Sequence, residues 1–258
     1  MSARDLKNRG GRLEVLGVQV DRVDSKQALG MIESMLETPA CKQVVTLNPE
    51  YVMRANEDPE LKRILNGAEL SVADGMGIVW ASRLLGEPLK GRITGTGLLP
   101  EIASICASSG QSLFLLGGQP GVAELAAARL SEQIPGLVIA GVSSNDPGAA
   151  IDPQTVEHIN GSGAGVLAVA YGCPKQDFWI DRNRGKLTGV RVAIGVGGAL
   201  DFISGEVPRA PRWIRRAGME WLFRLGLEPS RLGRMLVLPR FGWRVLRVRA
   251  RSVRKNSR

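Results

Sequence analysis

Residues 166–177 read Val166-Leu167-Ala168-Val169-Ala170, then Tyr171-Gly172-Cys173, then Pro174-Lys175-Gln176-Asp177. The first five residues form an apolar run with the length of a buried β-strand, and a turn follows them. A helical stretch, Pro174–Arg184, comes next. The chain repeats this order. The other candidate strands are Leu13–Val20, Gln43–Leu47, Leu70–Ala73, Ser112–Leu116, Leu137–Val142 and Arg191–Val196, and the other amphipathic stretches are Lys26–Leu36, Gly77–Leu85, Leu98–Ala107 and Val122–Gln133.

Short apolar strands that alternate with helices predict an α/β fold, a Rossmann-like, mostly parallel sheet with helices on both faces. The alternation stops near Phe202, and the chain becomes helical, basic and aromatic after Pro208. We therefore expect an α/β domain over residues 1–205 and a basic helical C-terminal appendage over residues 206–258. In parallel sheets ligands bind at the carboxyl ends of the strands, so the residues after each strand are the place to look for chemistry.

Composition excludes several classes of protein. The chain has 258 residues, of which 44% are hydrophobic, which fits a globular core. No apolar stretch is long enough for a transmembrane helix, and the polar N-terminus does not resemble a secretory signal. The cysteines, Cys41, Cys106 and Cys173, lack metal-site spacing and predict a reduced chain without disulfides. The single histidine, His158, lies in a polar helical stretch and reads as an ordinary surface or partly buried residue.

The positive charge is concentrated at one end. From Arg209 to Arg258 fifteen basic residues stand against two acidic ones, a net charge of +13; the whole chain carries +9, so residues 1–208 carry −4. Within this segment Arg240, Arg244, Arg247, Arg251 and Arg254 share one helical face, and apolar side chains occupy the rest. This pattern favours a helix at an anionic membrane surface. A nucleic-acid surface and a solvated tail remain alternatives.

Polar side chains follow two of the strands. Thr46 and Asn48 come at the end of the second strand, where Asn48 can cap a helix that begins at Pro49 or, with Thr46, hydrogen-bond a sugar. Asp74, after the third strand and before Gly75, can cap the next helix or act as a general base.

Glycine-rich turns follow other strands or precede helices, and they predict a site for a nucleotide diphosphate. The G-x-G-x-x-G fingerprint and the P-loop Lys are missing, which disfavours a nicotinamide-dependent oxidoreductase. Lys175 and Gln176 stand in a first helical turn, where a positive side chain indicates a nearby anion. The residues that we expect around the donor are Arg92, Gly95, Gly117, Gly118, Tyr171, Gly172, Pro174, Lys175, Gln176, Gly197 and Gly198.

In this order the segments resemble the WecG/TagA/CpsF family of bacterial glycosyltransferases (glycosyltransferase family 26). The matching pieces span about residues 12–240; they are Thr46-Leu47-Asn48, Ala73-Asp74-Gly75, Arg92 with Gly95, Leu116-Gly117-Gly118, Gly172-Cys173-Pro174-Lys175-Gln176, Gly195-Val196-Gly197-Gly198, Arg209-Ala210-Pro211, Glu220-Trp221-Leu222-Phe223-Arg224 and Glu228-Pro229-Ser230-Arg231. The departures are Ala73 for the usual Pro, Asp177 for the usual Glu, and Ser143-Ser144-Asn145 where the family has Gly-Tyr-Phe.

The resemblance implies an inverting, metal-independent transfer of an N-acetylmannosamine-type or related hexose. The donor is a UDP-sugar and the acceptor a polyprenyl-diphosphate-linked sugar, in cell-surface polysaccharide synthesis at the cytoplasmic face of the membrane. It implies that the enzyme is peripheral and needs no cofactor. The residues that match the family's catalytic set are Asp74 as base, with Thr46, Asn48, Arg92 and Gln176. The resemblance also implies that appendage arginines, which match Arg224, Arg231 and Arg234, close over the active site as a lid and meet the lipid diphosphate, and that the helix from Arg240 onward is the membrane anchor.

On this hypothesis the partners are the two substrates and an anionic membrane surface, with no nucleic acid, and a homo-oligomer is possible. The alternative from another class is a nucleic-acid-binding protein that uses the basic segment. Its affinity for DNA or RNA would fall steeply with salt.

Overall fold

A computed structural model describes residues 11–144, 152–211, 213–214, 219–227, 233 and 236–256. Its centre is a six-stranded sheet in which every pair of neighbouring strands is parallel, in the order β4-β3-β8-β7-β5-β6. The strands are β3 (Lys42–Leu47), β4 (Leu70–Ala73), β5 (Ser112–Gly117), β6 (Val138–Ser143), β7 (Val166–Ala170) and β8 (Val192–Gly195). The α/β fold expected from the alternation is confirmed.

The first predicted strand is wrong. Residues 13–20 form no strand of the large sheet but most of an antiparallel hairpin, β1 (Arg12–Val15) and β2 (Val18–Asp21). Leu16 and Gly17 both have positive φ, 51° and 83°, as a two-residue hairpin turn requires. The Asp21 carboxylate accepts a hydrogen bond of 2.8 Å from the Ser71 backbone N–H, which ties the hairpin to β4.

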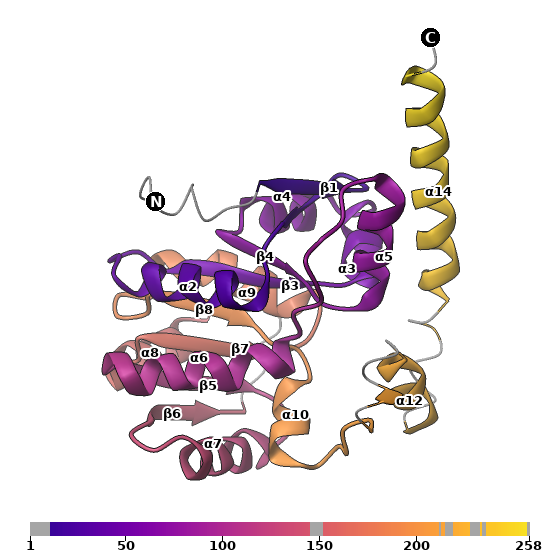
Figure 1. Cartoon of the computed structure of the whole chain (residues 1–258). Coiled ribbons are helices and arrows are strands. Elements are labelled where there is room, and N and C mark those ends of the chain that lie inside the picture. Colours follow the sequence, from indigo (N-terminus) through magenta and orange to yellow (C-terminus); the bar gives the residue numbers. More distant parts are fainter. Residues whose placement is uncertain are drawn as a thin grey trace.

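Helices cover both faces of the sheet (Figure 1). One face is covered by α2 (Ser25–Leu36), α6 (Gly95–Ser109), α7 (Val122–Gln133) and α10 (Ala199–Ser204). The opposite face is covered by α8 (Pro153–Ser162) and α9 (Lys175–Asn183), and beside them by α3 (Pro49–Ala55), α4 (Pro59–Gly67) and α5 (Met76–Leu85). A short 3-10 helix, η1 (Arg184–Lys186), follows α9. The five predicted helices are confirmed as α2, α5, α6, α7 and α9.

Strand side chains alternate between the two faces. Leu113 and Leu115 of β5 pack against α6 and α7, whereas Phe114 and Leu116 pack with α8 and α9. Each of the four is completely buried. Burial on both faces explains why the strands read as continuous apolar runs.

The C-terminal segment contains α12 (Glu220–Leu227) and α14 (Val237–Asn256). α14 stands beside α5 and extends past the body (Figure 1). Phe241 and Val245, 4% and 1% exposed, belong to the hydrophobic cluster of α3, α5 and the hairpin. The predicted boundary at residue 205 stays a prediction, but the core of the first domain includes side chains of the appendage. Among the described residues no helix is both long and apolar enough to cross a bilayer.

Candidate functional site

Loops at the carboxyl edge of the sheet converge, because all six strands run in the same direction. Close backbone approaches bring the loops together in pairs. A Cβ on Gly95, at the start of α6, would lie 3.2 Å from the Val196 carbonyl after β8. A Cβ on Gly77, in the first turn of α5, would lie 2.5 Å from Pro49 at the start of α3. The loops after β3, β4 and β8 thus meet the N-terminus of α6 at one place.

Asp74 lies at the centre of this junction. Its backbone N–H donates to the Leu47 carbonyl (2.7 Å), and its Oδ2 accepts a longer bond from the Gly95 N–H (3.4 Å). The interpretation of Asp74 as a helix cap is wrong, because the N-cap of α5 is Gly75, which makes no side-chain cap bond. The carboxylate lies instead at the N-terminus of the 15-residue helix α6, where the helix dipole stabilises negative charge.

Thr46 and Asn48 both make contacts within the protein. The Thr46 hydroxyl, 5% exposed, donates to the Gly195 carbonyl (3.2 Å) and so joins the carboxyl ends of β3 and β8. Asn48 is the N-cap of α3, as its place before Pro49 predicts, and its Oδ1 accepts from the Tyr51 N–H (3.0 Å). The cap does not use the Asn48 amide nitrogen. Direct sugar contacts of these residues stay a prediction.

Gln176 lies inside the protein, only 1% exposed. Its Oε1 accepts from the Gly197 N–H (2.9 Å), and its Nε2 donates to the Tyr51 hydroxyl (2.6 Å). That hydroxyl donates in turn to Oδ2 of Asp177 (2.7 Å). Gln176 therefore anchors the loop after β8 from the buried side, through its hydrogen bond with Gly197. Direct contact of Gln176 with the diphosphate stays a prediction.

The buried carboxyl of Asp177 is electrostatically unusual. Burial raises its pKa to about 7, and the hydrogen bond from Tyr51 opposes the rise. Burial, followed by the charge of Asp177, also raises the pKa of the Tyr51 hydroxyl well above its ordinary value. The neighbouring Cys173 thiol has a raised pKa for the same reasons, which disfavours it as a nucleophile. All three cysteines are free thiols, as predicted.

Glycine conformation shapes the remaining loops. Gly117 and Gly118 have φ of 95° and 87°, and Gly172 and Gly197 of 75° and 54°, a region that favours glycine. A Cβ on Gly117 would lie 2.7 Å from the Tyr171 ring, so the loops after β5 and β7 also touch. The remaining predicted donor residues lie at helix starts: Gly198 is the N-cap of α10, Pro174 the N-cap of α9, and Lys175 the exposed first residue of α9.

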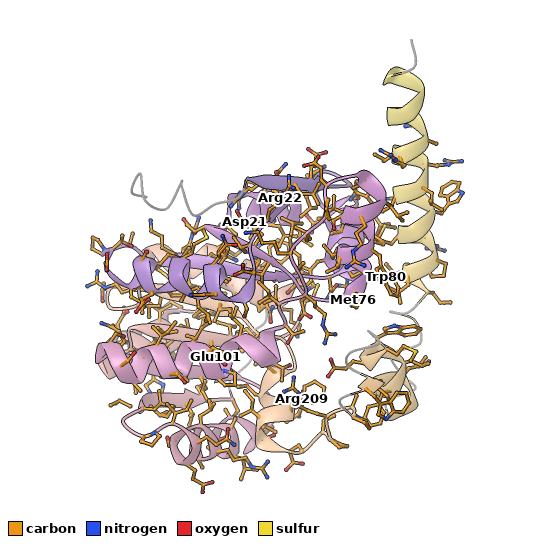
Figure 2. The ribbon with its side chains drawn as sticks, viewed as in Figure 1. Asp21, Arg22, Met76, Trp80, Glu101 and Arg209 are labelled. Carbon is orange, nitrogen blue, oxygen red and sulfur yellow. The ribbon has the colours of Figure 1, made fainter. Side chains whose placement is uncertain are left out.

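Arg92 connects this edge of the sheet to the basic segment. Its Nη1 lies 3.5 Å from Oε2 of Glu220, the first residue of α12, and both side chains are mostly buried. Met76 and Trp80 of α5 and Arg209, which follows α10, lie on the side of the body that α12 and α14 flank (Figure 2). The side chain of Arg224, and the whole of Arg231, Arg234 and Asn145, lie outside the described residues.

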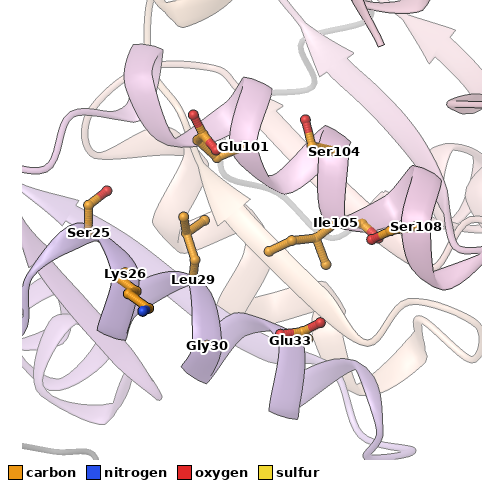
Figure 3. Close-up of a pocket in the computed structure, with 9 residues that line it drawn as sticks. All are labelled: Ser25, Lys26, Leu29, Gly30, Glu33, Glu101, Ser104, Ile105 and Ser108. Carbon is orange, nitrogen blue, oxygen red and sulfur yellow. The ribbon is translucent and has the colours of Figure 1, made fainter. Parts of the chain in front are cut away.

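Other candidate features lie apart from this junction. His158 is an exposed residue of α8 whose ring packs edge-on against Phe114, so it is an ordinary surface histidine. A shallow groove of about 590 Å³ runs between α2 and α6 and includes none of the predicted site residues (Figure 3). In the part of the chain that the structure describes, no cluster of His, Cys, Asp and Glu is arranged to hold a metal ion.

Comparison with known proteins shows the family of this chain. Residues 13–255 match the family described as "Glycosyl transferase WecG/TagA/CpsF family". A protein of Bacillus spizizenii is 35% identical over 89% of this chain and 89% of its own length. A Staphylococcus aureus protein is 30% identical over 95% of both chains, and one from Bacillus subtilis is 33% identical over 79% of this chain and 78% of its own. Each is named N-acetylglucosaminyldiphosphoundecaprenol N-acetyl-beta-D-mannosaminyltransferase.

Proposed function

Because the chain belongs to the WecG/TagA/CpsF family and is a glycosyltransferase, we propose that it moves an N-acetylmannosamine-type or related hexose from a UDP-sugar to a polyprenyl-diphosphate-linked sugar. The names of the relatives, which match along most of both chains, support this choice of substrates. The observation that carries the proposal is the position of Asp74: a carboxylate at a junction of strand-end loops, beside the N-terminus of α6.

In this mechanism Asp74 is the general base. The acceptor hydroxyl gives its proton to the Asp74 carboxylate as its oxygen bonds to the anomeric carbon. The bond from that carbon to the donor diphosphate breaks on the opposite face, and its electron pair leaves with UDP, so the configuration inverts. A base must lie within hydrogen-bond reach of the hydroxyl it deprotonates, and the half-buried position of Asp74 at the strand ends is consistent with that requirement.

Positive side chains stabilise the leaving UDP. Arg92 lies where the body meets α12, and Arg224, Arg231 and Arg234 follow in the sequence. Guanidinium groups bind phosphate through paired hydrogen bonds, so they can neutralise a diphosphate without a metal ion. Glu220 pairs with Arg92, and a bound diphosphate would compete with Glu220 for this guanidinium.

The basic segment binds the cytoplasmic face of the membrane, where the lipid-linked acceptor lies. Trp80 of α5 and Trp243 and Leu246 of α14 are each more than half exposed. Arg247 stacks over the Trp243 ring, 3.4 Å from its centroid. Exposed aromatic and apolar side chains among arginines favour a lipid surface over nucleic acid. Phe241 and Val245 take no part in this surface, because they pack into the body. The possible homo-oligomer stays a prediction.

A turnover assay tests the proposed function. The protein is incubated with UDP-N-acetylmannosamine and an N-acetylglucosaminyl-diphosphate lipid, with and without EDTA, and released UDP and lipid-linked product are measured. We expect equal turnover with and without EDTA. Loss of turnover in EDTA would overturn the metal-independent mechanism, and absence of product would overturn the choice of sugars.

A further inference from the structure

A chain of three hydrogen bonds runs through the interior beneath the site. The Gly197 N–H donates to Oε1 of Gln176 (2.9 Å), Nε2 of Gln176 donates to the Tyr51 hydroxyl (2.6 Å), and that hydroxyl donates to Oδ2 of Asp177 (2.7 Å). Every bond runs in the same direction, from the loop after β8 to the buried carboxyl group.

This direction fixes the orientation of the Gln176 amide. The Tyr51 hydroxyl has one hydrogen, which it gives to Asp177, so toward Gln176 it can only accept. The Gln176 nitrogen must therefore face Tyr51 and its oxygen must face Gly197. A rotated amide would set N–H against N–H at Gly197 and oxygen against oxygen at Tyr51.

Burial makes that orientation matter. Gln176, Tyr51 and Asp177 are 1%, 3% and 0% exposed, so bulk water cannot replace a lost partner. A buried polar group that loses its partner costs more than the bond itself contributed. The orientation of the amide is thus set at one end by the Gly197 N–H and at the other by Tyr51 and Asp177, two residues on different helices.

The amide in turn holds the loop after β8 in place. A Cβ on Gly195 would overlap Nε2 of Gln176, and Gly197 has a φ of 54°. The other side of this loop faces α6, because a Gly95 Cβ would lie 3.2 Å from the Val196 carbonyl. The loop is held between Gln176 and the same Gly95 whose N–H faces Asp74. A shift of Gln176 would therefore move the loop relative to the proposed base.

We propose that Tyr51 and Asp177 are positioning residues for the donor diphosphate. They orient Gln176, and Gln176 fixes the loop of residues 196–198 in the conformation that receives the diphosphate. The inference rests on the proposed function, since it assumes that this loop faces the UDP of the donor.

Tyr51→Phe is the variant that tests it. The ring and its packing are kept, but Gln176 loses its acceptor and Asp177 loses its donor. With the UDP-sugar varied, we expect the KM to rise about tenfold, as the loss of one buried hydrogen bond predicts, and kcat to stay within about threefold. The affinity for UDP should fall by the same factor, and the backbone amide resonance of Gly197 should shift.

A second substitution tests whether the two residues act through one chain. Asn at position 177 can still accept from Tyr51, so Asp177→Asn should raise KM by only about threefold. In the Tyr51→Phe/Asp177→Asn double variant KM should be no higher than in Tyr51→Phe alone, because the chain is already broken. A multiplied effect would overturn the shared chain.

Asn183→Ser is the matched control. Asn183 is a fully buried polar residue of the same helix, but its amide bonds the Trp179 carbonyl (2.9 Å) and the Asp152 N–H (3.3 Å). It should lower Tm while leaving the KM within about twofold. If Tyr51→Phe and Asn183→Ser raise KM equally, the role of Tyr51 is merely structural and the inference is overturned.

Direct binding of UDP separates the two proposals. A wild-type protein that binds UDP while Tyr51→Phe binds it equally well would overturn the inference and leave the proposed function standing. A wild-type protein that binds no UDP would overturn both.

Discussion

The α/β body and the C-terminal helix α14 differ in how their polar side chains are placed. In the core of the α/β body, polar side chains are few, and those described above have defined partners: Thr46 joins two strands, and Gln176 and Asp177 of α9 belong to one directed chain. In α14 the charges are many and exposed, and the exposed apolar side chains lie among them. Residues 1–208 carry −4 and residues 209–258 carry +13. On the proposed function, the body orients a small substrate, whereas α14 binds a broad anionic surface.

The comparison also shows where the two regions join. Arg92 pairs with Glu220, and Phe241 and Val245 enter the cluster of α3 and α5. α14 therefore has a buried face that belongs to the body and an exposed face that does not. Four experiments test this division, beginning with the one of largest expected effect.

Asp74→Asn should remove most of the activity and leave the surface properties unchanged. Positioned base catalysis contributes about 10²–10⁴-fold, so we expect kcat to fall by that factor. UDP affinity and vesicle binding should be retained, as isothermal titration and co-sedimentation would show. Asp58→Asn is the control, since Asp58 caps α4 and has no contact at the loop junction. Turnover near that of the wild type would rule out Asp74 as the base.

Phe241→Ala and Trp243→Ala should affect different properties, although the two residues lie only two positions apart on α14. Phe241 is 4% exposed, so its truncation should lower the free energy of unfolding by about 3–5 kcal/mol, measured by chemical denaturation. Trp243 is 53% exposed, so its truncation should weaken binding to vesicles and change stability little. Equal losses of stability would contradict the division of α14 into a buried and an exposed face.

Charge removal on α14 should weaken membrane binding. Arg247, Arg249 and Arg251 are all exposed, and near an anionic leaflet each is worth roughly 1 kcal/mol. Replacing the three by Gln removes roughly 3 kcal/mol and should lower affinity for phosphatidylserine or phosphatidylglycerol vesicles by roughly 100- to 200-fold. Arg63→Gln on α4, which removes one exposed charge from the body, serves as control. Tighter binding to a DNA or RNA oligonucleotide than to these vesicles would favour the nucleic-acid alternative instead.

Asp177→Asn should change how stability depends on pH. The carboxyl accepts from Tyr51 of α3 and lies near the Cys173 thiol, and Nε2 of Gln43 of β3 donates to the Asp177 backbone carbonyl (3.4 Å). None of these partners is a cation. Its folded pKa of about 7 lies above its unfolded value, so its contribution to stability is lost as pH rises through 7. The free energy of unfolding of Asp177→Asn, taken relative to that of the wild type, should therefore rise by about 2 kcal/mol from pH 5 to pH 8. A pH-independent difference in Tm would contradict the raised pKa.

The fold was largely predictable, because burial on both faces leaves a continuous apolar run for each strand. The hairpin was missed although Leu16 and Gly17 interrupt the alternation of Leu13–Val20. The turn requires Leu16 in a left-handed conformation, which few sequence patterns signal. Within the site, the position of Asp74 after a strand predicted its place at the carboxyl edge. The same rule predicted the glycine loops around it.

The buried chain could not be predicted from local pattern. Tyr51 and Asp177 are 126 positions apart, and Arg92 and Glu220 are 128 apart, so only the fold brings them together. The sequence held two signals. One is Tyr51 in the first turn of the apolar helix α3, and the other is the pair Gln176-Asp177 in the first turn of α9. Each is too common alone to indicate a contact.

The entry of Phe241 and Val245 into the cluster of α3 and α5 has a consequence for synthesis. The N-terminal part of a chain leaves the ribosome first, so α3 and α5 emerge long before α14, which covers them. Until α14 emerges, the nascent chain displays an uncovered apolar strip of the kind that chaperones bind and proteases find. A chain interrupted before Phe241 would therefore expose this apolar strip, a surface that cellular quality control can detect.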